Sequence, residues 1–288
     1  MRTANSEAAL RRTGAKHIFT VLCAFMFVFC LINSERISEE SLLYLKLCGT
    51  RVVPALFVCS VLCGVICSDT AFYRLCALPF FGTEAAVLAM GLLGGFPLGA
   101  AAAAGLYDDG LVSRRQAEYL CAFANVPSLS FIAGYTGNAL GSRKSGLILA
   151  ALTALTALLT ALLMKFLFLD KSERYIKPAA GSALRRSFPE ILSQSCLTML
   201  TVCGCIVFFG SISVSFPREI RGFFEMSGGI NSCNSPTKAA VLLGFSGLSV
   251  IMQTAAVCEN RFSVRPYICA KLMQSAFMGA AAYLVFGY

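Results

Sequence analysis

The most informative parts of this sequence are two stretches, Ala122-Phe-Ala-Asn-Val-Pro-Ser-Leu-Ser-Phe131 and Leu242-Leu-Gly-Phe-Ser-Gly-Leu-Ser-Val-Ile251. Each lies near the middle of an apolar segment that is long enough to cross a bilayer. Each carries a helix breaker, Pro127 or Gly247, followed by Leu-Ser and then by bulky apolar residues. Two interrupted membrane helices at corresponding places in two halves of a chain indicate a transporter substrate site. The sequence therefore predicts a small membrane permease built from an inverted repeat.

The composition favours a membrane protein and argues against a nucleic-acid-binding one. The chain is 57% hydrophobic and 14% charged, with a mean hydropathy of +0.72. Several apolar runs exceed the roughly 18 residues that indicate a membrane span. The net charge is +9, but the basic residues cluster at the edges of apolar segments, where membrane topology explains them. We expect a lipid bilayer as a partner and no nucleic acid.

The residue types for metal, cofactor or enzymatic chemistry are poorly represented. The 14 cysteines form no CxxC pair, and the chain has a single histidine, so neither a metal site nor a cofactor is expected. Aspartates such as Asp108 and Asp170 lie at loop edges, and no nucleophile has a base nearby in the sequence. We expect a protein that is not an enzyme.

Apolar segmentation predicts an all-α polytopic membrane protein with about seven transmembrane helices and two re-entrant hairpins in an inverted repeat. The mixed segment 34–50 is expected to form a short interfacial helix. The next span, 51–67, is entered through Pro54, which a first helical turn tolerates. The predicted divisions are an N-terminal tail with an uncleaved first helix (1–33), the first repeat (34–168), a basic cytoplasmic linker (169–187) and the second repeat (188–288).

Each repeat is predicted to hold one hairpin and one broken helix. The first hairpin, about 84–106, contains Gly94-Gly-Phe-Pro-Leu-Gly-Ala100, which should not hold a straight helix. Irregular backbone at membrane depth survives only where protein or a polar cavity satisfies it, and a plain kinked span is the alternative. The second hairpin is expected at about 217–236. The broken helices are expected at about 116–140 and 237–258.

The positive-inside rule gives an independent check on the repeat. With the basic N-terminus in the cytoplasm, the basic linker and Arg261 also fall inside. The order span, hairpin, span, span then occurs twice with opposite orientation. Arg143-Lys144, which falls outside, is the exception.

The two interruptions supply polar groups that suit a small anion. Unwinding a helix frees backbone N–H groups that suit a carboxylate and carbonyl groups that suit a cation. The sequence therefore allows a coupling ion, H+ or Na+, and does not determine which. Serine hydroxyls in membrane helices also bond back to their own helix, which is the structural alternative for each serine. The candidate substrate-binding side chains at the two breaks are Asn125, Ser128, Ser130, Ser246, Ser249 and Gln253.

Glu225 is a carboxylate flanked by apolar residues and glycine within a segment that could enter the membrane. An ionised carboxylate at the bilayer centre costs roughly 2.5–3.5 kcal/mol, so it is seldom there without a role. We expect either that it binds substrate or accepts a coupling proton, or that it sits at the interface beside Arg221.

Five segments in order resemble the YlbJ-type sporulation integral membrane proteins. These belong to the nucleoside-recognition (Gate) superfamily and are distantly similar to concentrative nucleoside transporters. The segments are Arg51-Val-Val-Pro-Ala-Leu-Phe57, Gly94–Ala100, Phe123–Phe131, Phe224-Glu-Met-Ser-Gly-Gly-Ile230 and Gly244-Phe-Ser-Gly-Leu-Ser-Val250. The resemblance implies passage of dipicolinic acid, a pyridine dicarboxylate, toward the developing spore. It also implies the bacterial cell membrane, specifically the outer forespore membrane derived from the mother cell.

The resemblance also implies site positions in both halves. The family usually has Ser-Gly-Tyr-Pro where this chain has Gly94-Gly-Phe-Pro, and Cys-Asn-polar-Gly-Pro where this chain has Ala124-Asn-Val-Pro-Ser. These departures remove a hydroxyl at Gly94 and at Phe96. The implied positions are Gly95, Pro97 and Gly99 at the first hairpin, Asn125, Pro127 and Ser128 at the first break, Glu225, Ser227 and Gly228 at the second hairpin, and Gly247, Ser249 and Gln253 at the second break.

Two other functions remain open at this stage. One is a carrier of nucleosides or other small metabolites. The other is a non-transporting sporulation membrane protein that docks partners through loop residues such as Arg185 and Arg186. The partners to expect are a small-molecule anion, the lipid bilayer, and either further copies of the chain or sporulation membrane proteins.

Overall fold

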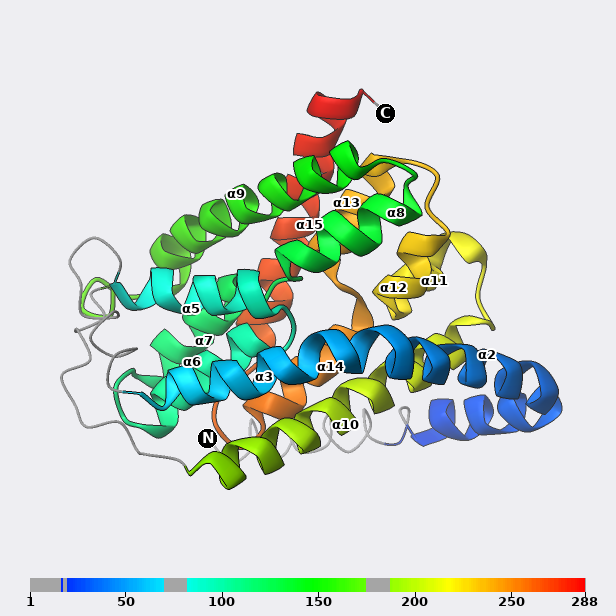
Figure 1. Cartoon of the computed structure of the whole chain (residues 1–288), viewed down its shortest axis with the longest axis horizontal. Helices are drawn as coiled ribbons and strands as arrows, with labels where there is room; N and C mark the ends of the chain where they lie inside the picture. Colours follow the sequence, from blue (N-terminus) through cyan, green and yellow to red (C-terminus); the bar gives the residue numbers. More distant parts are fainter. Residues whose placement is uncertain (1–16, 18–19, 70–81, 175–186, 288) are drawn as a thin grey trace, which may run out of the picture.

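The computed structural model describes residues 17, 20–69, 82–174 and 187–287, and this part is helical with no strand (Figure 1). The prediction of an all-α protein is therefore confirmed. The elements are an apolar helix Thr20–Ile32, α2 (Ser34–Leu47), a π-helical turn η1 (Cys48–Val52), α3 (Val53–Cys67), α5 (Gly82–Gly94), α6 (Leu98–Asp108), α7 (Arg114–Ala124), a second π-helical turn η2 (Phe131–Thr136), α8 (Gly137–Ala139), α9 (Arg143–Phe168), α10 (Phe188–Ser213), α11 (Arg218–Phe224), α12 (Met226–Asn231), α13 (Pro236–Phe245), α14 (Gly247–Cys258) and α15 (Arg265–Phe286).

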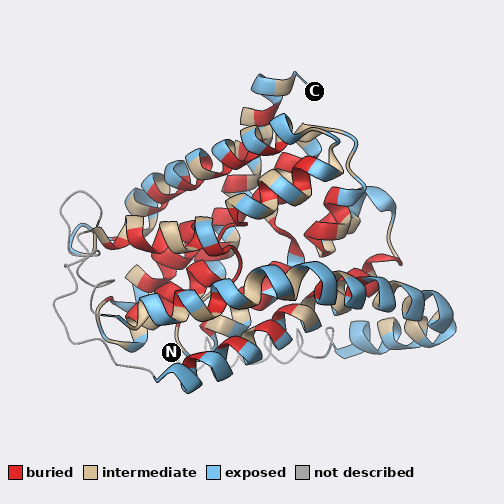
Figure 2. Ribbon diagram, viewed as in Figure 1, coloured by how far each residue is buried: buried red, intermediate tan, exposed pale blue. Residues whose placement is uncertain are grey.

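Five helical stretches among the described residues are long and apolar enough to cross a membrane: Ser34–Cys67, Arg143–Phe168, Phe188–Ser213, Pro236–Cys258 and Arg265–Phe286. Figure 2 shows that their outward faces are exposed, whereas buried residues gather on the inner helices and hairpins. The exposed faces carry large apolar side chains such as Leu62, Leu167 and Leu200, at 56%, 74% and 72% exposure. Such surface suits lipid rather than water, so the fold is that of a membrane protein.

The predicted division between an interfacial helix at 34–50 and a span at 51–67 is not observed. The structure joins them in one helical run of 34 residues, Ser34–Cys67. The π-helical turn η1 lies just before Pro54, and the Val53 N–H donates to the Cys48 carbonyl within it. Because proline cannot donate an N–H, a π-turn at this point shifts the hydrogen-bond register without ending the helix.

The helix order of one half recurs in the other. The first half runs α3, the α5–α6 hairpin, the interrupted α7–α8 and then α9. The second runs α10, the α11–α12 hairpin, the interrupted α13–α14 and then α15. The two pairs of short helices, which we call the hairpins, lie at Gly82–Asp108 and Arg218–Asn231.

Ion pairs connect three loops at one end of the bundle: the loop between α6 and α7, the loop after α9 and the loop after α14. We call this end the Arg115 end. Arg115 pairs with Asp170 and Glu173, while Arg261 pairs with Asp108 at 2.9 Å. Glu173 and Asp170 raise the pKa of the Arg115 guanidinium above its ordinary value, because they stabilise the charged form. The segments that contain Asp108, the start of α7, the end of α9 and the loop after α14 therefore lie together.

The two hairpins enter the bundle from opposite ends. The α5–α6 hairpin returns to the Arg115 end through Asp108. The start of α10 also lies there, since Ile191 and Gln194 line a cavity with Asp109. Helix α10 has 26 residues and is therefore about 39 Å long, so it carries the chain to the opposite end, where the α11–α12 hairpin begins. Figure 1 shows this separation of the hairpins.

Helices α13 and α15 pack backbone against backbone. A Cβ on Gly244 would lie 2.5 Å from the Ser275 Cα and 2.8 Å from the Gln274 carbonyl oxygen. The Ser275 hydroxyl donates to the Val241 carbonyl at 2.9 Å. Small residues that admit close helix approach and polar groups that bond across helices are the usual means of packing in membranes.

We predict that Gly244→Ala lowers the stability of the purified protein in detergent by about 1–3 kcal/mol, because the added methyl group has no space. Thermal unfolding measures this. Gly204→Ala on α10 is the control, since a Cβ there meets nothing within 4 Å. Equal unfolding temperatures for the two variants would contradict the packing described here.

Candidate functional site

The first interruption separates α7 from the helical turn that begins at Leu129. Residues 125–128 are not helical, and Asn125 has φ −83° and ψ 87°. The Ser128 hydroxyl accepts from the Phe131 N–H at 3.2 Å and lies 3.2 Å from the Ser130 hydroxyl. Ser128 therefore caps the resumed helix. Ser130 is exposed, unlike Asn125 and Ser128, so the structure does not bring it into the buried cluster.

The tip of the α5–α6 hairpin sits directly on this interruption. A Cβ on Gly91 or Gly99 would collide with the Ala124 carbonyl oxygen. Gly95 has φ 77°, and a Cβ there would lie 3.0 Å from the Ser128 nitrogen. Glycine is needed at these places because backbone packs on backbone. Of the family-implied positions, Gly95 and Gly99 thus contact the first break, and Pro97 precedes α6 as its N-cap residue.

Asn125 connects three parts of the molecule and is fully buried. Its backbone N–H continues α7 by donating to the Cys121 carbonyl. Its side-chain oxygen accepts from the Ala100 N–H at 3.4 Å, near the start of α6. Its side-chain nitrogen donates to the Thr254 hydroxyl on α14 at 2.7 Å. One amide therefore joins the first break, the first hairpin and the helix that follows the second break.

The second interruption mirrors the first. Ser246 and Gly247 both have left-handed backbones, with φ 73° and φ 84°. A Cβ on Gly247 would lie 3.3 Å from the Phe224 carbonyl oxygen and 3.3 Å from the Met226 nitrogen. The second break therefore packs on the point where the α11–α12 hairpin itself unwinds. In both halves the break in the long helix contacts the break in the neighbouring hairpin.

Glu225 lies at the break of the second hairpin and is 2% exposed. Its carboxylate accepts from the Ser227 and Gly228 N–H groups at 3.0 and 2.7 Å, and so caps α12. Arg221 donates instead to the Phe216 and Val214 carbonyls. Glu225 is therefore buried and does not pair with Arg221, whereas its predicted role toward a substrate or a proton stays a prediction. Ser227 and Gly228 contribute backbone donors, and the Ser227 carbonyl accepts from the Tyr135 hydroxyl at 2.9 Å.

The polar side chains of the second break differ in how they are used. The Ser246 hydroxyl donates to the Leu243 carbonyl at 3.0 Å and so bonds back to its own helix, which was the alternative to substrate binding for each serine. Ser249 accepts from the Gln253 amide at 3.1 Å, and both are buried. The two hairpins and the two broken helices then share one apolar core that contains Phe96, Met226 and Val250.

Lys271 is the main feature that the sequence analysis missed. It lies on α15, seven residues into a 22-residue apolar helix, and is 0% exposed. Its ammonium donates to the Gln274 side-chain oxygen at 2.8 Å and lies over the rings of Phe96 and Tyr267, 5.2 and 5.4 Å from their centroids. The sequence does indicate this residue, because a lysine inside an apolar segment is rare in membranes and is usually functional.

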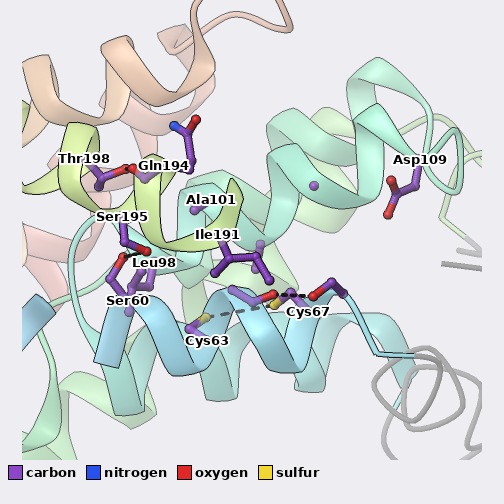
Figure 3. Close-up of a pocket in the computed structure, with 14 residues that line it drawn as sticks. Ser60, Cys63, Cys67, Leu98, Ala101, Asp109, Ile191, Gln194, Ser195 and Thr198 are labelled. Atoms are coloured by element: carbon purple, nitrogen blue, oxygen red, sulfur yellow. Dashed lines mark hydrogen bonds between the residues drawn. The ribbon is translucent and has the colours of Figure 1, made fainter. Parts of the chain in front are cut away.

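A cavity of about 100 Å³ lies between α3, α6 and α10 (Figure 3). Ser60 of α3 donates to Ser195 of α10 at 3.2 Å beside it, and Gln194 and Thr198 add polar groups. The cavity runs from Asp109 to Leu98, next to the first hairpin tip. A larger hollow of about 640 Å³ lies beside the second hairpin and is lined by Arg218, Arg221 and Lys238 among others.

No group of three or more histidine, cysteine or acidic residues that could hold a metal ion occurs in the described part of the chain. No protein-family model matches this sequence, and no curated protein or solved structure matches it either. The function is therefore inferred from the residues of this chain and their geometry.

We predict that the bond between Asn125 and Thr254 couples the two halves. In a double-mutant cycle with Asn125→Ala and Thr254→Val, the coupling free energy should lie between about 0.6 kcal/mol, the average for such bonds in a membrane protein, and about 1.7 kcal/mol, the maximum. Thermal unfolding in detergent measures each variant. Strictly additive effects would mean that the two side chains do not interact.

We further predict that Glu225→Gln lowers stability by about 1–3 kcal/mol, because a neutral amide replaces a carboxylate that accepts two buried backbone N–H groups. Glu219→Gln, on the exposed side of α11, is the matched control and should leave the unfolding temperature unchanged. A Glu225→Gln protein as stable as the control would rule out the capping role.

Proposed function

We propose that this chain is a membrane permease, a secondary transporter for a small anionic metabolite. The observation that carries the proposal is that each half packs a broken helix on a broken hairpin, and that Asn125 and Thr254 join the two halves. Interrupted helices at corresponding places in two repeats are how many transporters build a substrate site. Nothing in this architecture requires catalysis, and no enzyme activity is proposed.

We propose a topology of seven membrane spans and two re-entrant hairpins in an inverted repeat. Two further spans, the helix Thr20–Ile32 and the interrupted helix α7–α8, would add to the five longer helices and make seven. The entry of the hairpins from opposite ends supports the inversion. The Arg115 end gathers the loops that the positive-inside rule assigns to the cytoplasm, so we place that end inside the cell.

Basic side chains near the first hairpin tip and beside the second hairpin favour an anion. Lys271 is buried next to Phe96, and the hollow beside the second hairpin carries three basic side chains, Arg218, Arg221 and Lys238, with one acidic side chain, Glu219. Clefts with an excess of one sign of charge concentrate ligands of the opposite sign. The resemblance to YlbJ-type Gate-superfamily proteins makes dipicolinic acid the first candidate substrate and the outer forespore membrane the proposed location.

Transport would proceed by alternating access. One hairpin and its broken helix would move against the other pair around the shared core of Phe96, Met226 and Val250. The glycine contacts at each break set two backbones directly against each other, without intervening side chains. Rigid-body shifts of the two hairpins would therefore open the shared core alternately to the two sides of the membrane.

We predict that the purified protein in liposomes takes up pyridine-2,6-dicarboxylate. Ser249→Ala should lower the initial rate about tenfold, because it removes a buried polar group at the second break. The control is Thr201→Val on the exposed face of α10, where the hydroxyl only bonds back to the Leu197 carbonyl. Protein content of the liposomes must be equal for all variants.

Uptake of nucleosides in place of the dicarboxylate would favour the nucleoside carrier. Absence of uptake for both solutes would refute transport, and a requirement for Arg185 and Arg186 in cells would then favour an assembly protein.

A further inference from the structure

The Lys271 side chain is fully buried and has no carboxylate partner among the described residues. An ammonium has three N–H donors, and the structure gives this one a single acceptor, the neutral side chain of Gln274 at 2.8 Å. Lysines near helix ends usually extend to the membrane surface. Lys271 lies about 9 Å along α15 and is fully covered, so it does not do so.

The surroundings of Lys271 contain a second polar group without a partner. Tyr267 is 1% exposed, and its hydroxyl lies close to the Asn125 and Thr254 side chains without a hydrogen bond of regular geometry to any described residue. Most buried side-chain hydroxyls have a hydrogen-bond partner, so an exception requires an explanation. Tyr267 and Lys271 lie one turn apart on α15, and the ammonium sits over the tyrosine ring.

Two unsatisfied donors thus face the same buried region. The hydroxyl can donate one hydrogen bond, and the ammonium can donate two more in addition to the one to Gln274. A group that accepts from both and also balances the positive charge is a carboxylate. Aromatic faces of Phe96 and Tyr267 hold the ammonium in the absence of such a group, as cation–π contacts do.

We propose that Lys271 and Tyr267 form the pair of side chains that binds a carboxylate group of the substrate. This inference rests on the proposed transport function and names the residues that recognise its substrate. Phe96 at the first hairpin tip lies over the ammonium, so a carboxylate reaches Lys271 when that tip moves aside. The pair therefore adjoins the first break through Asn125, where the sequence placed the site.

Ligand-dependent thermal unfolding of the full-length protein in detergent tests the pair. The probes are pyridine-2,6-dicarboxylate, its uncharged analogue pyridine-2,6-dicarboxamide, and chloride. For wild type, we expect stabilisation by the dicarboxylate alone. Lys271→Met should weaken the apparent affinity about 30-fold or more, because it removes a buried charge partner. Lys271→Arg should retain part of the affinity, and the exposed control Lys46→Met should retain all of it.

Tyr267→Phe is the sharper variant. Because the hydroxyl has no partner among the described residues, its removal should leave the unfolding temperature of the ligand-free protein unchanged or higher. It should nevertheless weaken dicarboxylate binding about tenfold. A purely structural tyrosine would not give this combination, and the variant remains informative if Lys271→Met fails to fold.

The outcomes separate the two proposals. Wild-type affinity in both Lys271→Met and Tyr267→Phe, together with dicarboxylate uptake by wild type, would overturn the carboxylate pair and leave the permease standing. Stabilisation by chloride as strong as by the dicarboxylate would also overturn it, in favour of an inorganic anion. Uptake of an uncharged solute with no response to the dicarboxylate would refute the anionic substrate itself.

Discussion

The structure depends on one constraint: peptide groups released in the middle of a membrane bundle must find partners within the protein. At the first break, the Asn125 side chain accepts from the start of α6 and donates to Thr254 of the other half. At the second, the Glu225 carboxylate caps the hairpin against which Gly247 packs. The interruptions are thus stabilised by side chains that reach across elements, and this ties the two halves into one unit.

Glycine makes these contacts possible. Gly91 and Gly99 let the first hairpin approach the Ala124 carbonyl, and Gly247 lets the second break approach the second hairpin. Unwound backbone therefore meets unwound backbone in both halves. In the proposed permease, the hairpins enter from opposite ends, so movement of either one would open the shared core toward a different side of the membrane. The proposed alternating access needs such an arrangement.

The sequence was sufficient for features that are local. Pro127 and Gly247 marked both breaks, and Gly95 and Pro97 marked the first hairpin tip, since breakers act on the backbone at their own positions. The predicted boundary between segments 34–50 and 51–67 relied on Pro54 and was wrong, because a π-helical turn accommodates this proline within one long helix. The contacts of Lys271 could not be derived, because they depend on which residues of other elements come within reach.

The most direct test is an experimental structure of the full-length protein in lipid nanodiscs with pyridine-2,6-dicarboxylate. We expect both helices to be interrupted, at Asn125–Ser128 and at Ser246, and the dicarboxylate to bind between the first hairpin tip and Lys271. Uninterrupted helices facing lipid, or a ligand bound only at the bundle surface, would contradict the proposed binding site.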